Sequence, residues 1–110
     1  MVALMSFPDA DDPAVGRAWR RDVLAIAKRR GIRVIGPGAF GVVRTDIGLN
    51  ATFCAPTAHP GRLALVSQSG AVCTAMLDFA GSMQIGFSTV TSLGGGIDIG
   101  GMEITDPRRP

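Results

Sequence analysis

The first third of the chain is predicted to form one amphipathic helix followed by one short strand. Asp12 and Pro13 are typical of a helix start, with the aspartate as N-cap and the proline at the first helical position. Apolar residues then recur every three or four positions, the spacing of one helical face, until Gly31 ends the pattern. These residues are Val15, Trp19, Val23 and Ile26. Residues 32–35 predict a strand that stops at the Gly-Pro-Gly sequence of residues 36–38.

The second half of the chain predicts a strand, a helix and a second strand. Residues 63–66 form an apolar run of strand length, and residues 71–80 are predicted to form a helix that is closed by Gly81. Because this helix is apolar nearly all round, we expect it to be buried. Residues 87–93 then predict a strand that ends in a run of glycines. Such a unit is typical of a right-handed crossover in a parallel sheet.

Residues 44–61 separate the two halves and show no hydrophobic periodicity. They contain Pro56 and Pro60, and we interpret them as an irregular linker. The elements on either side alternate between helix and strand, which favours the α/β class. We therefore predict pieces of two parallel-sheet domains, over residues 1–43 and 62–110, joined by this linker.

The composition excludes several classes of protein. Of the 110 residues, 46% are hydrophobic and 18% are charged, which is too apolar for a disordered chain. Every apolar run is interrupted well before the roughly 20 residues that a membrane-spanning helix needs. No cationic start followed by an apolar stretch marks a secretory signal. We therefore expect a cytoplasmic protein without a membrane partner.

Charge and cysteine content add two further exclusions. The net charge is only +2, but basic residues cluster between residues 17 and 33, where Asp22 is the only acid. We interpret this cluster as the solvated face of a helix and predict no nucleic-acid partner, because no aromatic platform for bases accompanies it. Cys54 and Cys73 are isolated thiols without neighbouring ligands, so we predict no metal site. The clustered basic residues are Arg17, Arg20, Arg21, Lys28, Arg29, Arg30 and Arg33.

The turn Ser67-Gln68-Ser69-Gly70 is the best candidate for chemistry. It joins a predicted strand to a predicted helix, whose first N–H groups and dipole favour an anion. The serine hydroxyls add donors, and the glycine permits close approach of a bound phosphate. The alternative is that Ser69 is simply an N-cap and Gly70 relieves crowding, since no Walker lysine is present. His59 is the only histidine and lies in the linker, so we predict no catalytic residue.

Three stretches of the sequence resemble one enzyme family. Residues 62–81, RLALVSQSGAVCTAMLDFAG, and the following IGFSTVTSLGG resemble the second domain of NDP-forming acyl-CoA synthetases. These enzymes include the succinyl-CoA synthetase alpha subunit and the ADP-forming acetate–CoA ligases. Both stretches also resemble the ligase-like region of GNAT-type protein lysine acetyltransferases. Upstream, RGIRVIGPGAFGVV is similar to the end of the family's CoA-binding Rossmann domain, where GIRxIGPNxxG is usual.

The resemblance implies a fold and a reaction. Residues 1–43 would be the C-terminal part of a CoA-binding Rossmann-like domain. Residues 62–110 would begin a succinyl-CoA synthetase-like domain, so the fold class is α/β with pieces of two Rossmann/flavodoxin-like parallel-sheet domains. The family converts an acid, CoA and ATP or GTP (with Mg) into acyl-CoA, a nucleoside diphosphate and phosphate, through a phosphohistidine. The implied partners are CoA and a small carboxylic acid.

Two sets of site residues follow from the resemblance. Residues 67–70 match the phosphate-binding turn at the N-terminus of the helix that faces the phosphohistidine. Gly36, Pro37 and Gly38 match the segment beside the thiol end of CoA. Family members usually carry asparagine where this chain has Gly38, so the polar contact of that side chain is lost.

Several parts of the family have no counterpart in these 110 residues. The sequence contains no match to the Gly-rich CoA loop, the phosphohistidine, the ATP-grasp domain or the GNAT domain. We therefore expect a fragment that is inactive as a ligase on its own and that works with a missing ATP-grasp or GNAT region. The alternatives are a regulatory or CoA-binding region of a GNAT-type lysine acetyltransferase and a truncated remnant without function.

Overall fold

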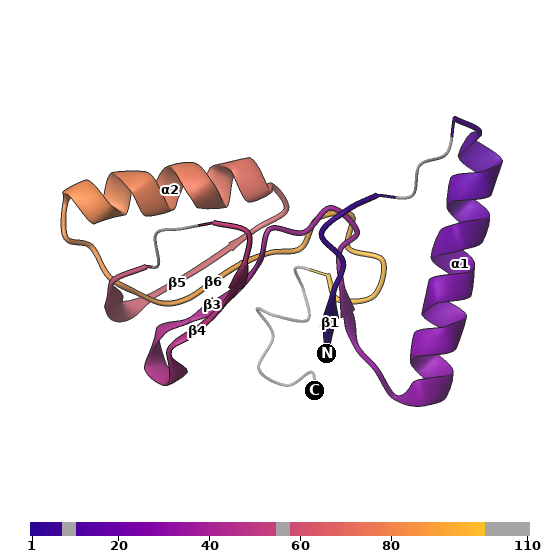
Figure 1. Cartoon of the computed structure of the whole chain (residues 1–110), viewed down its shortest axis with the longest axis horizontal. Coiled ribbons are helices and arrows are strands. Elements are labelled where there is room, and N and C mark those ends of the chain that lie inside the picture. Colours follow the sequence, from indigo (N-terminus) through magenta and orange to yellow (C-terminus); the bar gives the residue numbers. More distant parts are fainter. Residues whose placement is uncertain (8–10, 55–57, 101–110) are drawn as a thin grey trace.

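The computed structural model describes residues 1–7, 11–54 and 58–100. The molecule is elongated, with extents of 45 × 34 × 21 Å, and Figure 1 shows α1 at one end and α2 above a sheet at the other. A small sheet pairs β1 with β2, and a larger sheet has the order β4-β3-β6-β5. The elements are β1 (Val2–Ala3), α1 (Pro13–Arg30), β2 (Val34–Ile35), β3 (Gly41–Arg44), the 3₁₀ turn η1 (Thr45–Ile47), β4 (Leu49–Thr52), β5 (Pro60–Ser67), α2 (Gly70–Ser82) and β6 (Phe87–Ser92).

Local signals determine the ends of helix α1 as the sequence predicts. The Asp12 carboxylate accepts a hydrogen bond from the Ala14 N–H at 2.9 Å, and Gly31 ends the helix in the left-handed conformation, with φ +63°. The apolar stripe of this helix is packed only in part, because Val15 remains 54% exposed and Ala27 is the buried residue of the helix. The two-residue strands β1 and β2 are too short to cover a helix of 18 residues.

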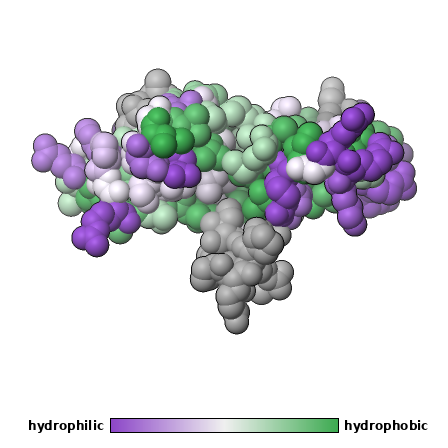
Figure 2. All heavy atoms as spheres, turned by 90° about the horizontal axis from the view of Figure 1, so that it is seen from below, coloured by the Kyte–Doolittle hydropathy of each residue, from purple (hydrophilic) through white to green (hydrophobic). Residues whose placement is uncertain are grey.

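Figure 2 shows a dense group of hydrophilic side chains at the α1 end of the molecule. The six basic residues of α1 are exposed, which agrees with a solvated helix face. They are Arg17, Arg20, Arg21, Lys28, Arg29 and Arg30.

The larger sheet contains the predicted parallel crossover and an unpredicted hairpin. Strands β5 and β6 are parallel, with α2 between them in sequence, as predicted. Strand β3 runs antiparallel to both β4 and β6, so the sheet is mixed. The prediction that residues 44–61 are irregular is wrong for residues 44–52 and for the start of β5, because β3 and β4 form a hairpin. Hydrogen bonds between β3 and β6 hold the hairpin in place. Such pairing with a distant strand produces no periodic pattern of apolar residues in the sequence. The division into domains stays a prediction.

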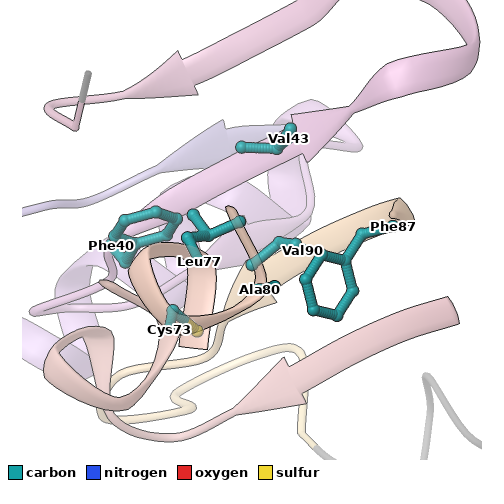
Figure 3. Close-up of a cluster of buried hydrophobic side chains, with 7 residues drawn as sticks. All are labelled: Phe40, Val43, Cys73, Leu77, Ala80, Phe87 and Val90. Atoms are coloured by element: carbon teal, nitrogen blue, oxygen red, sulfur yellow. The ribbon is translucent and has the colours of Figure 1, made fainter. Parts of the chain in front are cut away.

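The main core lies between α2 and the sheet. Figure 3 shows its side chains converging from α2, β3 and β6 and from the segment before β3. The prediction that α2 is buried nearly all round is wrong: three of its residues face the core, whereas Phe79 is 56% exposed. Cys73 is fully buried in this core, as predicted, and the burial raises the pKa of its thiol. The cluster consists of Phe40, Val43, Cys73, Leu77, Ala80, Phe87 and Val90.

None of the helices in the described residues combines the length and the apolar character that crossing a bilayer requires. Within the same residues, His, Cys, Asp and Glu side chains do not gather in groups of three or more that could hold a metal ion.

Candidate functional site

The predicted phosphate-binding turn lies where the two parallel strands end together. Ser67 is the last residue of β5 and is in register with Ser92, the last residue of β6. The Leu93 N–H donates to the Ser67 carbonyl at 2.7 Å, which holds the two strand ends side by side. The carboxyl ends of parallel strands are the edge at which α/β sheets bind ligands.

Hydrogen bonding within the turn uses only part of its donor capacity. The Ser67 Oγ accepts from the Ser69 N–H at 3.0 Å, and the Ser69 Oγ accepts from the Val72 N–H at 3.3 Å. Ser69 is therefore the N-cap of α2, which is what the alternative interpretation of this turn predicts. The N–H groups of Gly70 and Ala71 have no hydrogen-bond partner among the described residues, and each serine hydroxyl keeps a proton to donate. N-capping and anion binding are thus compatible here.

Gly70 has a packing role in addition to its place in the turn. A Cβ atom at this position would lie 3.0 Å from the Cβ of Phe40, tighter than ordinary van der Waals contact. Phe40 is 1% exposed and belongs to the main core. The absence of a side chain at Gly70 therefore lets the start of α2 sit directly on Phe40.

The predicted CoA segment, residues 36–38, packs against the loop that follows β6. The Gly95 N–H donates to the Pro37 carbonyl at 2.7 Å, and the Ile97 N–H donates to the Gly36 carbonyl at 3.1 Å. Gly36 and Pro37 are buried, whereas Gly38 is half-buried. The structure therefore brings both predicted site segments to the loop after β6.

Gly38 adopts φ +70°, a conformation that glycine allows and that asparagine also tolerates. A Cβ atom there would meet the ring of Phe7, an exposed side chain. The change from the family's asparagine to glycine thus leaves the backbone conformation accessible to both residues and makes room for the Phe7 ring.

Ser92 connects the two segments, and the sequence did not single it out. Its side chain is buried, and its Oγ accepts a hydrogen bond from the Phe40 N–H at 2.6 Å. Phe40 in turn underlies Gly70, so Ser92 links the chain after residues 36–38 to the start of α2. Nothing in the sequence distinguished it from the other hydroxyl residues of the same strand, Ser88, Thr89 and Thr91.

His59 lies at the other end of the strand pair. Its carbonyl accepts from the Phe87 N–H at 2.8 Å, and Phe87 begins β6, whereas the candidate site lies beyond the end of that strand. The position of His59 therefore gives it no part in the candidate site.

An ion pair ties the loop after β6 to the small sheet. Both Asp98 carboxylate oxygens lie within 3.3 Å of the Arg33 Nε, and the carboxylate also accepts from the Val34 N–H at 2.7 Å. Burial alone would raise the pKa of Asp98, whose side chain is 21% exposed. The hydrogen bonds from Arg33 and Val34, with the Arg33 charge, outweigh that effect and lower the pKa.

We expect Asp98→Asn to lower the free energy of unfolding at pH 7 by about 1 kcal/mol. A carboxylate whose pKa is lowered by folding stabilises the protein above its unfolded pKa and loses that contribution as the pH falls through its folded pKa. The difference between wild type and variant should therefore shrink below about pH 4. Urea denaturation of both proteins between acid and neutral pH measures this difference in the free energy of unfolding.

The matched control is Asp46→Asn, because Asp46 forms an exposed ion pair with Arg44. It should change stability little at any pH. A difference between wild type and Asp98→Asn that stays constant down to acid pH would contradict the assigned role of the carboxylate.

Comparisons with known proteins agree with this fold. Residues 60–107 match the family model of the succinyl-CoA ligase like flavodoxin domain. The chain is 50% identical over 74 residues to the ADP-forming acetate–CoA ligase of Methanocaldococcus jannaschii, which covers 67% of this chain and 10% of that protein. It is 38% identical over 96 residues to the ADP-forming 4-hydroxybutyrate–CoA ligase of Nitrosopumilus maritimus, covering 86% of this chain and 14% of that protein.

Solved structures show the same likeness. A crystal structure of a Pyrococcus horikoshii protein matches 94% of this chain and 24% of its own, with a TM-score of 0.85 and 31% identity. The dinucleotide-forming acetyl-coenzyme A synthetase 1 of Ca. Korarchaeum cryptofilum, in complex with phosphate and ADP, has a TM-score of 0.79 and 26% identity. That match covers 97% of this chain and 24% of the synthetase chain.

The parallel strand pair, its crossover helix and the turn between them define an α/β protein with a Rossmann/flavodoxin-like fold. The chain belongs to the NDP-forming acyl-CoA synthetase family. It spans 10 to 14% of the length of the first three curated relatives it matches.

Proposed function

We propose that this chain supplies a phosphate-binding turn and part of the CoA site of an acid–CoA ligase that forms a nucleoside diphosphate. The overall reaction would convert an acid, CoA and ATP or GTP into acyl-CoA, ADP or GDP, and phosphate. The observation that carries the proposal is the pair of N–H groups at Gly70 and Ala71 that have no partner among the described residues, flanked by the hydroxyls of Ser67, at the end of β5, and Ser69, the N-cap of α2.

The donors of this turn suit a phosphate group. Backbone N–H groups at a helix N-terminus point outward along the helix axis, and the helix dipole favours negative charge there. Ser67 and Ser69 can each donate a hydroxyl proton while still accepting their backbone hydrogen bonds. Gln68 adds an amide side chain between them. A bound phosphoryl group would be held by these groups and its charge stabilised by the dipole.

The CoA part of the proposal rests on the place of residues 36–38. They contact Leu93 and Gly95, next to the ends of the parallel strands, so a ligand at the phosphate turn would be near them. Gly38 is the accessible member of the three, and Gly36 and Pro37 would act by holding its backbone in place. The described residues offer no carboxylate cluster, so we assign no residue to a magnesium ion.

The experiment measures binding of inorganic phosphate and of ADP by calorimetry. Ser69→Ala and Gly70→Val should each weaken binding by about 1 to 2 kcal/mol, since one removes a donor and the other displaces the turn from Phe40. Because Ser69→Ala also removes the N-cap, Ser69→Gly is the better variant for binding: glycine keeps most of the cap's stability but has no hydroxyl.

Ser82→Ala is the matched control. Ser82 lies at the opposite end of the same helix, where its hydroxyl donates to the Phe79 carbonyl at 2.7 Å. Its loss should leave phosphate affinity unchanged. Equal affinity of wild type, Ser69→Gly and Gly70→Val would refute the phosphate-binding turn.

A further inference from the structure

Two consecutive residues, at the end of β6 and just after it, hold both ends of the candidate phosphate-binding turn. At the first end of the turn, the Ser67 carbonyl accepts a hydrogen bond from the Leu93 N–H at 2.7 Å. At the second end, Gly70 rests on Phe40, whose N–H donates to the Ser92 Oγ at 2.6 Å. The span of the turn is therefore set from the end of β6 on both sides.

Gly70 meets the backbone of Phe40 as well as its side chain. A Cβ atom at Gly70 would lie 3.0 Å from the Phe40 Cβ, 3.5 Å from its Cα and 3.6 Å from its backbone nitrogen. This nitrogen is the one whose proton Ser92 accepts. A shift of the Phe40 backbone would therefore move Gly70, whose N–H is one of the two proposed phosphate donors.

The Ser92 side chain is too deeply buried to contact a ligand. Ser92 is 0% exposed, and it lies two positions after Val90 on β6. Both side chains therefore point to the side of the sheet that α2 covers, where Val90 belongs to the main core (Figure 3). Among the described residues, the Ser92 hydroxyl forms its hydrogen bond with the Phe40 N–H alone. Any effect of this hydroxyl on binding must therefore pass through Phe40.

We propose that Ser92 is a positioning residue for the phosphate-binding turn, because its hydroxyl oxygen fixes the Phe40 backbone where Gly70 rests on it. The proposal rests on the phosphate-binding function proposed for residues 67–70. Donors bind an anion best when their directions are fixed before it arrives. A glycine has no side chain to hold it in place, so the direction of the Gly70 N–H depends on the surface beneath it.

A purely structural role for Ser92 makes a different prediction. Ser92→Ala leaves the buried Phe40 N–H without its acceptor, so the free energy of unfolding should fall under either role. The affinity for phosphate separates the two roles when it is measured on folded protein. A positioning role alters the folded turn and weakens binding, whereas a purely structural role leaves the affinity of the folded variant unchanged.

The test is calorimetry with inorganic phosphate on the 110-residue chain, at a temperature where circular dichroism shows each variant to be folded. We expect Ser92→Ala to weaken phosphate binding about fivefold to tenfold, roughly the effect of one hydrogen bond. This loss should not add to that of Gly70→Val, since both variants displace Gly70 from Phe40. It should add to the loss in Ser69→Gly, which removes a separate donor.

Thr45→Val is the matched control. The Thr45 Oγ1 donates to the Phe87 carbonyl at 2.6 Å, so this hydroxyl also bonds to the backbone, but at the start of β6. Its loss should lower stability and leave phosphate affinity unchanged. Wild-type affinity in Ser92→Ala, with weaker binding in Ser69→Gly, would overturn the role of Ser92 alone, as would an equal loss in Thr45→Val. Equal affinity in every variant would refute the phosphate-binding turn itself.

Nuclear magnetic resonance of the wild type tests the same link if Ser92→Ala does not fold. Inorganic phosphate should shift the amide proton resonances of Gly70 and Ala71, and also that of Phe40, which is buried and out of reach of the ligand. The amide of Val43, a core residue of β3, should not respond. A response at the turn without one at Phe40 would contradict the proposal.

Discussion

Replacing Phe40 with alanine should lower the free energy of unfolding by about 3 to 5 kcal/mol. Phe40 is 1% exposed and packs among β3, β6 and α2, so the truncation would leave a cavity in the main core. Small domains have total stabilities of about 5 to 15 kcal/mol, so much of the stability would be lost. Urea denaturation followed by circular dichroism measures the change.

The Phe40 variant should also affect the candidate site. The Phe40 side chain supports Gly70, and its N–H donates to Ser92. Phosphate affinity should therefore fall even under conditions where the variant remains folded.

The matched control is Phe53→Ala. The Phe53 ring lies edge-on to the Phe40 ring, with centroids 5.8 Å apart, but Phe53 is 69% exposed. Its truncation should cost only about 1 kcal/mol, the value of one aromatic pair. Similar losses in the two variants would show that Phe40 does not occupy the core position described.

Gly94→Ala should destabilise the protein by about 3 kcal/mol, for two separate reasons. Gly94 adopts φ +55°, a conformation that L-amino acids with a side chain rarely take. A Cβ atom there would also collide with the Pro37 carbonyl oxygen, a backbone atom that cannot move without displacing residues 36–38. Thermal or urea denaturation gives the change in stability, and the affinity for CoA should decline with it if residues 36–38 contact that cofactor.

Gly16→Ala is the control, and its expected change in stability has the opposite sign to that of Gly94→Ala. Gly16 lies inside α1, and a Cβ atom there would meet nothing within 4 Å. Alanine should stabilise the helix by about 1 kcal/mol, because glycine is the poorer helix former. If Gly94→Ala were as stable as wild type, the close contact between the loop after β6 and residues 36–38 would be wrong.

The fold could be predicted from the sequence where local chemistry determines it. Asp12 and Gly31 mark the ends of α1 through their own backbone and side-chain preferences, and both predictions are confirmed. The strand–helix–strand order of β5, α2 and β6 is also confirmed, because local runs of apolar residues mark these elements in the sequence. The β3–β4 hairpin was missed, because β4 is mostly exposed and is held by its pairing with β3.

Burial was the least predictable property. The apolar character of α2 predicted a helix surrounded by protein, but only one of its apolar stripes is covered among the described residues. The apolar composition of a helix shows that its faces can pack against other elements. Whether a given face is buried depends on which elements lie beside it. The interpretation as the ligase-like region of a lysine acetyltransferase stays a prediction.

The sequence by itself determined the α/β class and the family, and it predicted the turn at residues 67–70 as a place for an anion. These are properties of short segments, because caps, periodicity and motifs depend on residues only a few positions apart. The tertiary structure decided that Gly70 rests on Phe40, that Ser92 connects the two site segments, and that residues 36–38 meet the loop after β6. Those contacts join residues that are 30 or more positions apart, and only the packing of the chain brings them together.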